Sequence, residues 1–112
     1  MTKKEASEIL EVAKRVVGNM KDVFEVEGVI EKLEDYKQEK GVDFTAEIYV
    51  WKDEGRTLED NFELSSYLSA DDQVPLLKIA IDLLREKKKK SISDFQENAR
   101  SFEKLTKEAL NE

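Results

Sequence analysis

The stretch that decides the fold class is VDFTAEIYVWKDEGR, residues 42–56, because the spacing of apolar residues changes there. Two sets of side chains alternate along its first part: Phe44, Ala46, Ile48 and Val50 against Thr45, Glu47, Tyr49 and Trp51. Alternation places the two sets on opposite faces of an extended chain, so this part is predicted to be a β-strand. The segment KDEGR, residues 52–56, predicts the turn that follows it.

The predicted strand needs a partner, because an unpaired strand leaves its backbone N–H and C=O groups without hydrogen bonds. Residues 57–67 are the nearest candidate, with three apolar side chains on one parity: Leu58, Phe62 and Leu64. This predicts an antiparallel β-hairpin. The alternative is a short helix that begins at Thr57, with Asp60 three residues later as its capping partner.

Two helices are predicted before the strand, over residues 2–17 and 22–40. Thr2 followed by Glu5 matches a capping box, and apolar residues then recur at helical spacing. Gly18 is predicted to end the first helix. The second has its apolar stripe at Val26, Val29, Ile30, Leu33 and Tyr36. The alternative is one long helix with a kink near Gly18.

Two further helices are predicted after the hairpin. Ser69, Asp71 or Asp72 caps the third, and Pro75 suits its first turn, where backbone N–H groups lack helical partners. Ser93, with Gln96, caps the fourth, whose apolar face is Ile92, Phe95, Ala99, Phe102, Thr106 and Ala109. The sequence therefore predicts a single, mostly helical α+β domain over residues 1–112: two helices, a small antiparallel hairpin and two helices.

Four consecutive lysines, Lys87–Lys90, lie between the two C-terminal helices. We interpret them as the solvated last turn of the third helix and a connector, because lysines near a helix C-terminus interact favourably with its dipole. The alternative is a patch that contacts nucleic-acid phosphates. Acidic residues dilute such a patch on both sides, and no aromatic residue is interleaved with it, so direct nucleic-acid binding is not expected: Asp82, Glu86 and Asp94.

The composition excludes several classes of chemistry. The 112 residues include no Cys and no His, so Ser-His-Asp and Cys-His catalysis and the usual zinc sites are ruled out within this chain. We predict no catalytic residue, no metal and no cofactor, and hence a non-enzymatic protein. The sequence has no run of about 18 apolar residues, so no membrane span is predicted. The N-terminal residues lack the apolar run of a signal peptide. A cytoplasmic location is expected.

Negative charge is concentrated in the middle of the chain. Residues 22–72 carry sixteen acidic and five basic side chains, a net −11 in a chain of net −7. Four acidic residues spaced four apart are predicted to form one ridge on the second helix: Glu27, Glu31, Asp35 and Glu39. Like charges at this spacing destabilise a helix by about 0.2–0.5 kcal/mol per pair. Such a ridge is expected if it binds a basic surface of a partner. The alternative is that it serves only to keep the protein soluble.

Tyr49 and Trp51 form a second feature. If helices cover only the opposite face of the hairpin, both aromatic side chains lie on an open face, where aromatic residues often anchor interfaces. The alternative is that a helix covers this face too, because an exposed Trp is less common.

These features predict a small acidic binding protein, an inhibitor or regulator. It would engage a basic surface of a partner protein through residues 22–72, and carboxylates would stand in for phosphates if that surface binds nucleic acid. The predicted partner-binding residues are Glu27, Glu31, Asp35, Glu39, Tyr49 and Trp51. The alternative function is a self-assembling helical protein that forms a homo-oligomer through Phe95, Ala99 and Phe102 of the last helix. In composition alone, the chain is loosely similar to small accessory proteins of bacteriophages and mobile elements.

Overall fold

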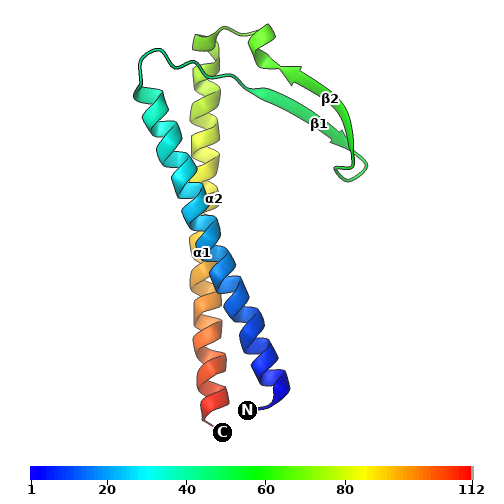
Figure 1. The fold of residues 1–112 in the computed structure, drawn as a ribbon, viewed down its shortest axis with the longest axis vertical. Helices are drawn as coiled ribbons and strands as arrows, with labels where there is room; N and C mark the ends of the chain where they lie inside the picture. Colours follow the sequence, from blue (N-terminus) through cyan, green and yellow to red (C-terminus); the bar gives the residue numbers. More distant parts are fainter. Residues whose placement is uncertain (112) are drawn as a thin grey trace. The chain divides into compact units, whose positions relative to one another are not determined.

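The computed structural model describes residues 1–111 as two long helices with a β-hairpin between them in the chain (Figure 1). The elements, in order, are α1 (Lys3–Gln38), β1 (Glu47–Lys52), β2 (Thr57–Glu63), a 3-10 turn (Leu64–Ser66) and α2 (Ala70–Leu110). The prediction of a mostly helical chain with a small antiparallel sheet is confirmed. The prediction of four helices is wrong, since the described residues form two α-helices.

Helix α1 begins with the predicted capping box. Thr2 Oγ1 accepts a hydrogen bond from the Glu5 N–H, and Glu5 Oε1 accepts one from the Thr2 N–H, both at 3.1 Å. The helix then continues through Gly18, where the sequence predicted its end. A glycine inside a helix costs about 1 kcal/mol relative to alanine. The helix nevertheless continues without interruption to Gln38, so the alternative prediction of one long helix is confirmed, while the kink predicted near Gly18 stays a prediction.

Helix α2 likewise begins as predicted and then continues past its predicted end. The Asp72 N–H donates to Ser69 Oγ at 3.2 Å, and the Ser69 N–H donates to Asp72 Oδ2 at 3.3 Å. Pro75 lies inside the helix, one turn later than predicted, because the helix begins at Ala70 and its backbone hydrogen bonds already start with the Gln73 N–H. The fourth helix and its Ser93 cap are wrong, because the helix runs without interruption through Lys87–Lys90 to Leu110.

The lysine run is therefore neither a helix end nor a connector. Lys88 continues the inward-facing positions of α2 and is half-buried, and its Nζ lies 3.7 Å from Glu27 Oε1 of α1. Ser91, one turn later, is almost completely buried. Lysine can occupy such a position because its aliphatic stem packs while its ammonium group reaches the edge of the interface.

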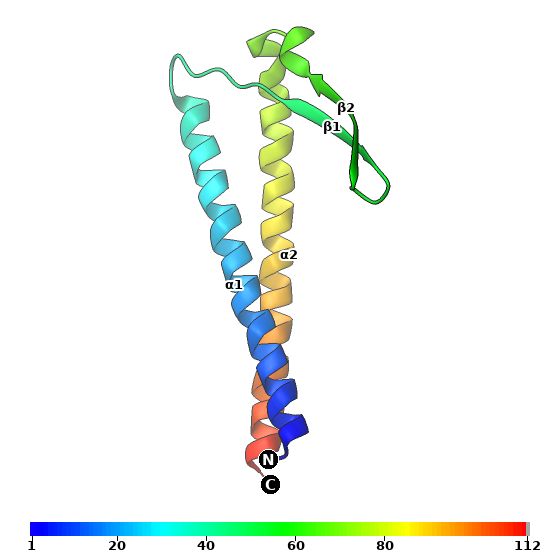
Figure 2. The ribbon, with the colours of Figure 1, turned by 45° about the vertical axis from the view of Figure 1, so that its right-hand side comes forward.

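The chain divides into two compact units, and each helix contributes to both. We call Met1–Lys32 together with Leu84–Glu112 the helical unit, and Leu33–Leu83 the hairpin unit. In the helical unit, the two helices lie side by side, and Met1 and Leu110 line the same apolar groove. In the hairpin unit, β1 and β2 lie side by side (Figures 1 and 2). That the chain is a single domain stays a prediction. Within residues 1–111, neither helix contains an apolar stretch long enough to cross a membrane.

Few apolar side chains are fully buried in either unit. The hairpin unit buries Leu77 and Ile81 of α2, beside the polar Gln73. The helical unit buries Val12 of α1 and Ala109 of α2. The apolar stripes that define the helices in the sequence are therefore only partly covered by this chain.

Residues 57–63 form a strand, which decides between the two alternatives in favour of the hairpin. The turn between the strands uses three successive residues with positive φ, Asp53 (55°), Glu54 (59°) and Gly55 (83°). Glycine adopts this backbone conformation without steric cost, and aspartate tolerates it better than most residues. The segment KDEGR was thus correctly predicted as a turn.

Candidate partner-binding surface

Acidic side chains are concentrated in the hairpin unit. It contains thirteen acidic and five basic residues, a net charge of −8, whereas the helical unit contains thirteen acidic and fourteen basic residues. The net charge of the whole chain therefore resides in the 51 residues of Leu33–Leu83. A surface that attracts a basic partner is expected on this unit.

An irregularity in the hairpin determines which side chains share a face. Val50 pairs with Asp60 but the next residue, Trp51, pairs with Leu58, so Glu59 is an extra residue in β2. Such a bulge shifts the alternation of the strand by one position. It moves Leu58 to the face that carries Tyr49 and Trp51. The prediction that Leu58 shares a face with Phe62 is wrong for this reason.

The Tyr49 and Trp51 side chains lie on an exposed hairpin face, with Trp51 54% exposed. Together with their cross-strand partners they form three successive pairs, which we call the aromatic-acidic face: Glu47 with Glu63, Tyr49 with Asn61, and Trp51 with Leu58. At about 3.3 Å per residue, these pairs span about 13 Å. Every residue of both strands is exposed, so this face is open to solvent.

Two carboxylates face each other at one end of the aromatic-acidic face. The Leu64 N–H donates to the Ala46 carbonyl at 3.0 Å, so the neighbouring pair, Glu47 and Glu63, occupies a position without inter-strand hydrogen bonds. Side chains at such positions are closest, with Cα atoms about 4.5 Å apart. Like charges directly opposite each other destabilise a hairpin. A cation placed between them would relieve this repulsion.

Tyr49 is coupled to these carboxylates. Its hydroxyl donates a hydrogen bond to Glu47 Oε2. This hydrogen bond raises the pKa of Tyr49 above its ordinary value of 10.0, and the negative charges of Glu47 and Glu63 and partial desolvation raise it further. The phenol therefore stays neutral to a higher pH than the phenol of a free tyrosine.

We expect Glu47→Gln to lower the pKa of Tyr49 toward 10.0. The substitution removes both the charged acceptor and the nearest negative charge, which are the main causes of the raised pKa. The Tyr49 ring-carbon shift in an NMR titration measures this residue separately from Tyr36 and Tyr67. Glu63→Gln is the matched control and should lower the pKa less, because Glu63 acts only through its charge. An unchanged Tyr49 pKa in Glu47→Gln would contradict the geometry of this face.

The opposite face of the hairpin is also exposed. It carries Ile48 and Val50 of β1 and Phe62 of β2, all of them accessible to solvent. An isolated two-stranded hairpin is only marginally stable in water. The ion pair between Lys52 Nζ and Glu59 Oε1, at 2.9 Å, joins the strands next to the bulge.

The predicted acidic ridge is only partly present. Glu31 and Asp35 are exposed on α1, as expected. Glu27 is half-buried and paired with Lys88 of the same chain, so part of its charge is neutralised internally. Glu39 is exposed but follows the last residue of α1. These four residues therefore do not form a continuous row of unpaired carboxylates on one helix.

Gln73 is an important residue of the hairpin unit that the sequence did not reveal. It is 3% exposed, and its Oε1 accepts a hydrogen bond from the Ala46 N–H, directly before β1, at 2.9 Å. Its Nε2 donates to the carbonyls of Leu68 and Ser69 at 3.4 Å. Gln73 therefore ties the start of the hairpin to the start of α2. A glutamine in an apolar helical stripe gives no sequence signal for such a contact.

Neither a metal site nor similarity to known proteins points to a function for this surface. Within residues 1–111, no three acidic side chains come together in a way that would hold a metal ion. Comparisons with protein-family models, with curated proteins and with solved structures found no match. The surface itself is therefore the basis for the functional proposal.

Proposed function

We propose that this protein is a non-enzymatic binding protein that engages a basic surface of a partner protein through its hairpin unit. The observation that carries the proposal is the combination, on one exposed face, of Tyr49 and Trp51 with the opposed carboxylates Glu47 and Glu63. The surplus of eight negative charges in the same unit supports it.

A lysine or arginine side chain of the partner suits this face for two reasons. An ammonium or guanidinium group over an exposed aromatic ring gains about 0.5–1 kcal/mol. The same cation, placed near Glu47 and Glu63, reduces the repulsion between them. The remaining acidic residues of the unit, Asp35 and Glu39 among them, would attract the basic surface over a longer range and speed up association. If that surface binds nucleic acid, the protein acts as an inhibitor or regulator by occupying it.

The proposal is tested with an arginine-rich peptide as the probe. Trp51 is the single tryptophan of the chain, so its fluorescence reports directly on the aromatic-acidic face. We expect saturable quenching or a spectral shift that weakens as salt is raised, because exposed charges are screened. Glu47→Gln combined with Glu63→Gln should weaken binding by about three- to tenfold, and Tyr49→Leu by about two- to fivefold.

The control is Glu8→Gln combined with Glu11→Gln. These residues are exposed on α1 in the helical unit, and their replacement changes the net charge by the same amount. Binding of the peptide should stay unchanged in this control. If both double variants weaken binding equally, the protein is acting only as a diffuse polyanion, and the proposed face is wrong.

A further inference from the structure

The helical unit carries apolar side chains on α1 that the chain does not cover. Residues facing α2 recur alternately three and four apart, at Ile9, Val12, Val16, Asn19 and Val23. A second set follows one position later with the same spacing, and we call it the outer seam of α1: Ala6, Leu10, Ala13, Val17, Met20 and Phe24. Val17 and Phe24 are each 65% exposed. Alternating three and four spacing is the pattern of helices that pack in bundles.

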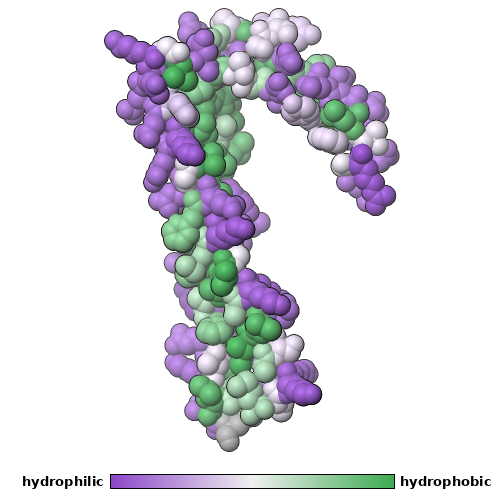
Figure 3. Space-filling view, viewed as in Figure 1, coloured by the Kyte–Doolittle hydropathy of each residue, from purple (hydrophilic) through white to green (hydrophobic). Residues whose placement is uncertain are grey.

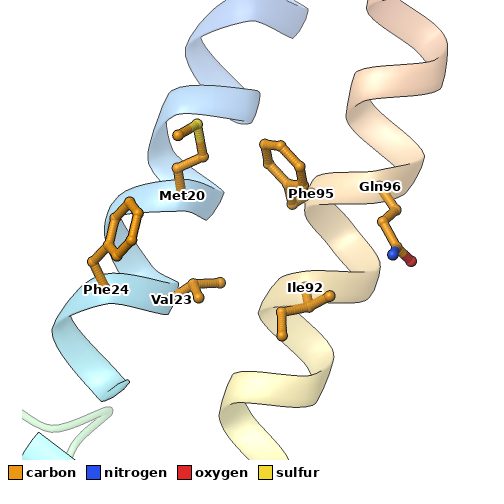
Figure 4. Close-up of a pocket in the computed structure, with 6 residues that line it drawn as sticks. All are labelled: Met20, Val23, Phe24, Ile92, Phe95 and Gln96. Atoms are coloured by element: carbon orange, nitrogen blue, oxygen red, sulfur yellow. The ribbon is translucent and has the colours of Figure 1, made fainter. Parts of the chain in front are cut away.

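Helix α2 carries a matching outer seam, which extends the predicted Phe95, Ala99 and Phe102 set: Ile92, Phe95, Ala99, Phe102, Thr106 and Leu110. The two outer seams lie on the same side of the helix pair. Met20 and Phe24 line one apolar groove with Ile92 and Phe95 (Figure 4), and Leu10 and Ala13 line another with Phe102 and Leu110. Hydrophobic side chains accordingly form a stripe along the helices of this unit (Figure 3).

The apolar residues buried within the helical unit are too few to account for its fold. Val12 and Ala109 are its buried apolar residues among those described, and the polar pair Asn19–Asn98 (2.8 Å) lies between the helices. The hydrophobic core of a folding unit of about 60 residues provides only a few kcal/mol of stability, even when it is well packed. Covering the outer seams would supply the burial that this unit lacks.

We infer that a second copy of this chain covers the outer seams, so that two helical units form a four-helix bundle. The α1 seam from Ala6 to Phe24 is about 27 Å long at 1.5 Å per residue. Two helices that are each about 10 Å across, with axes about 10 Å apart, present a face about 20 Å wide, so the two seams cover about 500 Å². Two such faces bury about 1,000 Å² in total, which reaches the lower limit for a specific interface.

The charges favour a second copy over a charged partner at this face. The helical unit is almost neutral, with fourteen basic and thirteen acidic residues, so two of these units meet without net repulsion. A strongly basic partner has no electrostatic reason to choose this unit over the hairpin unit, whose net charge is −8. A twofold dimer also requires only a self-complementary surface, which two largely apolar seams of similar spacing can provide.

The test is the mass of the full chain in solution, measured by light scattering and sedimentation over a wide concentration range. We expect the wild-type chain to have twice the 13.0 kDa of one copy. Leu10→Gln, Val17→Gln and Phe24→Gln together should reduce the mass to 13.0 kDa, because they place amides along the α1 seam. The matched control is Val29→Gln, which replaces an exposed apolar residue of α1 outside the outer seam and should leave the mass doubled.

A second measurement keeps the inference testable if the triple variant fails to fold. The melting temperature of a folded dimer rises with protein concentration, and that of a monomer does not. A wild-type chain that stays at 13.0 kDa, with a melting temperature independent of concentration, overturns the inference. So does a folded triple variant that remains dimeric. Trp51→Ser should leave the mass unchanged, since Trp51 belongs to the hairpin unit and to neither outer seam, and failure of the peptide-binding test would not affect this result.

Discussion

Replacing Ile81 with alanine is expected to lower the free energy of unfolding by about 2–5 kcal/mol. Ile81 is 2% exposed and is the largest fully buried apolar side chain among the described residues. Its truncation leaves a cavity in the hairpin unit, where Leu77 is the other buried apolar residue among those described. Few other buried side chains surround Ile81, so the packing lost in this variant is not compensated by the rest of the core. Urea unfolding followed by circular dichroism measures the change.

Ile79→Ala is the matched control for this substitution. Ile79 lies two residues earlier on the same helix and is 55% exposed. The same change there should alter the free energy of unfolding by no more than about 0.5 kcal/mol. Equal losses in the two variants would mean that Ile81 is not at the centre of the core and that the described burial is wrong.

Local signals in the sequence were sufficient to predict where several elements begin. The capping pairs Thr2–Glu5 and Ser69–Asp72 involve residues three apart, so their hydrogen bonds can be expected without knowledge of the rest of the chain. The alternation in residues 42–51 identified β1, although the strand begins only at Glu47, and the turn residues identified the reversal after it. All these interactions form between near neighbours in the sequence.

The ends of the predicted helices depended on contacts between distant residues, and those predictions failed. Gly18 is followed by Asn19, whose Oδ1 accepts a hydrogen bond from Asn98 Nδ2 at 2.8 Å. Glu27 similarly pairs with Lys88, inside the lysine run. In each case a residue on the other helix supports a segment that is locally unfavourable for a helix. Residues 60 or more positions apart form these pairs, so neither could be found from local spacing.

The candidate surface could be predicted only in part. Tyr49 and Trp51 were identified from alternation, and the structure places both on an exposed face. Glu63 was not identified, because its position opposite Glu47 depends on the register of the hairpin. The position of Leu58 depends on the bulge at Glu59, which has no glycine to signal it. Register and bulges arise from pairing between strands, which the pattern of one strand does not specify.

Gln73→Leu is expected to lower the free energy of unfolding by about 1–3 kcal/mol, although leucine is more apolar than glutamine. The substitution leaves the Ala46 N–H without its acceptor and removes the side-chain donor to the Leu68 carbonyl, whereas the Ser69 carbonyl keeps the backbone N–H of residue 73. Burial of an unpaired polar group costs more than the added apolar surface gains. Hydrogen exchange of the Ala46 amide should become faster than in the wild-type chain. Gln38→Leu, at an exposed position at the end of α1, should change neither quantity.

A second substitution at this position separates loss of the hydrogen bonds from loss of side-chain shape. A protonated carboxyl group can both accept and donate, as the Gln73 amide does, whereas a carboxylate only accepts. Burial raises the pKa of a carboxyl group above its unfolded value of about 4.3. The folded state of Gln73→Glu then binds more protons, so its stability relative to wild type is greatest below that value and falls as pH rises. Gln73→Leu should show the same deficit at all pH values. If Gln73→Glu also shows a constant deficit, position 73 is open to water and the hydrogen bonds of Gln73 do not hold the hairpin to α2.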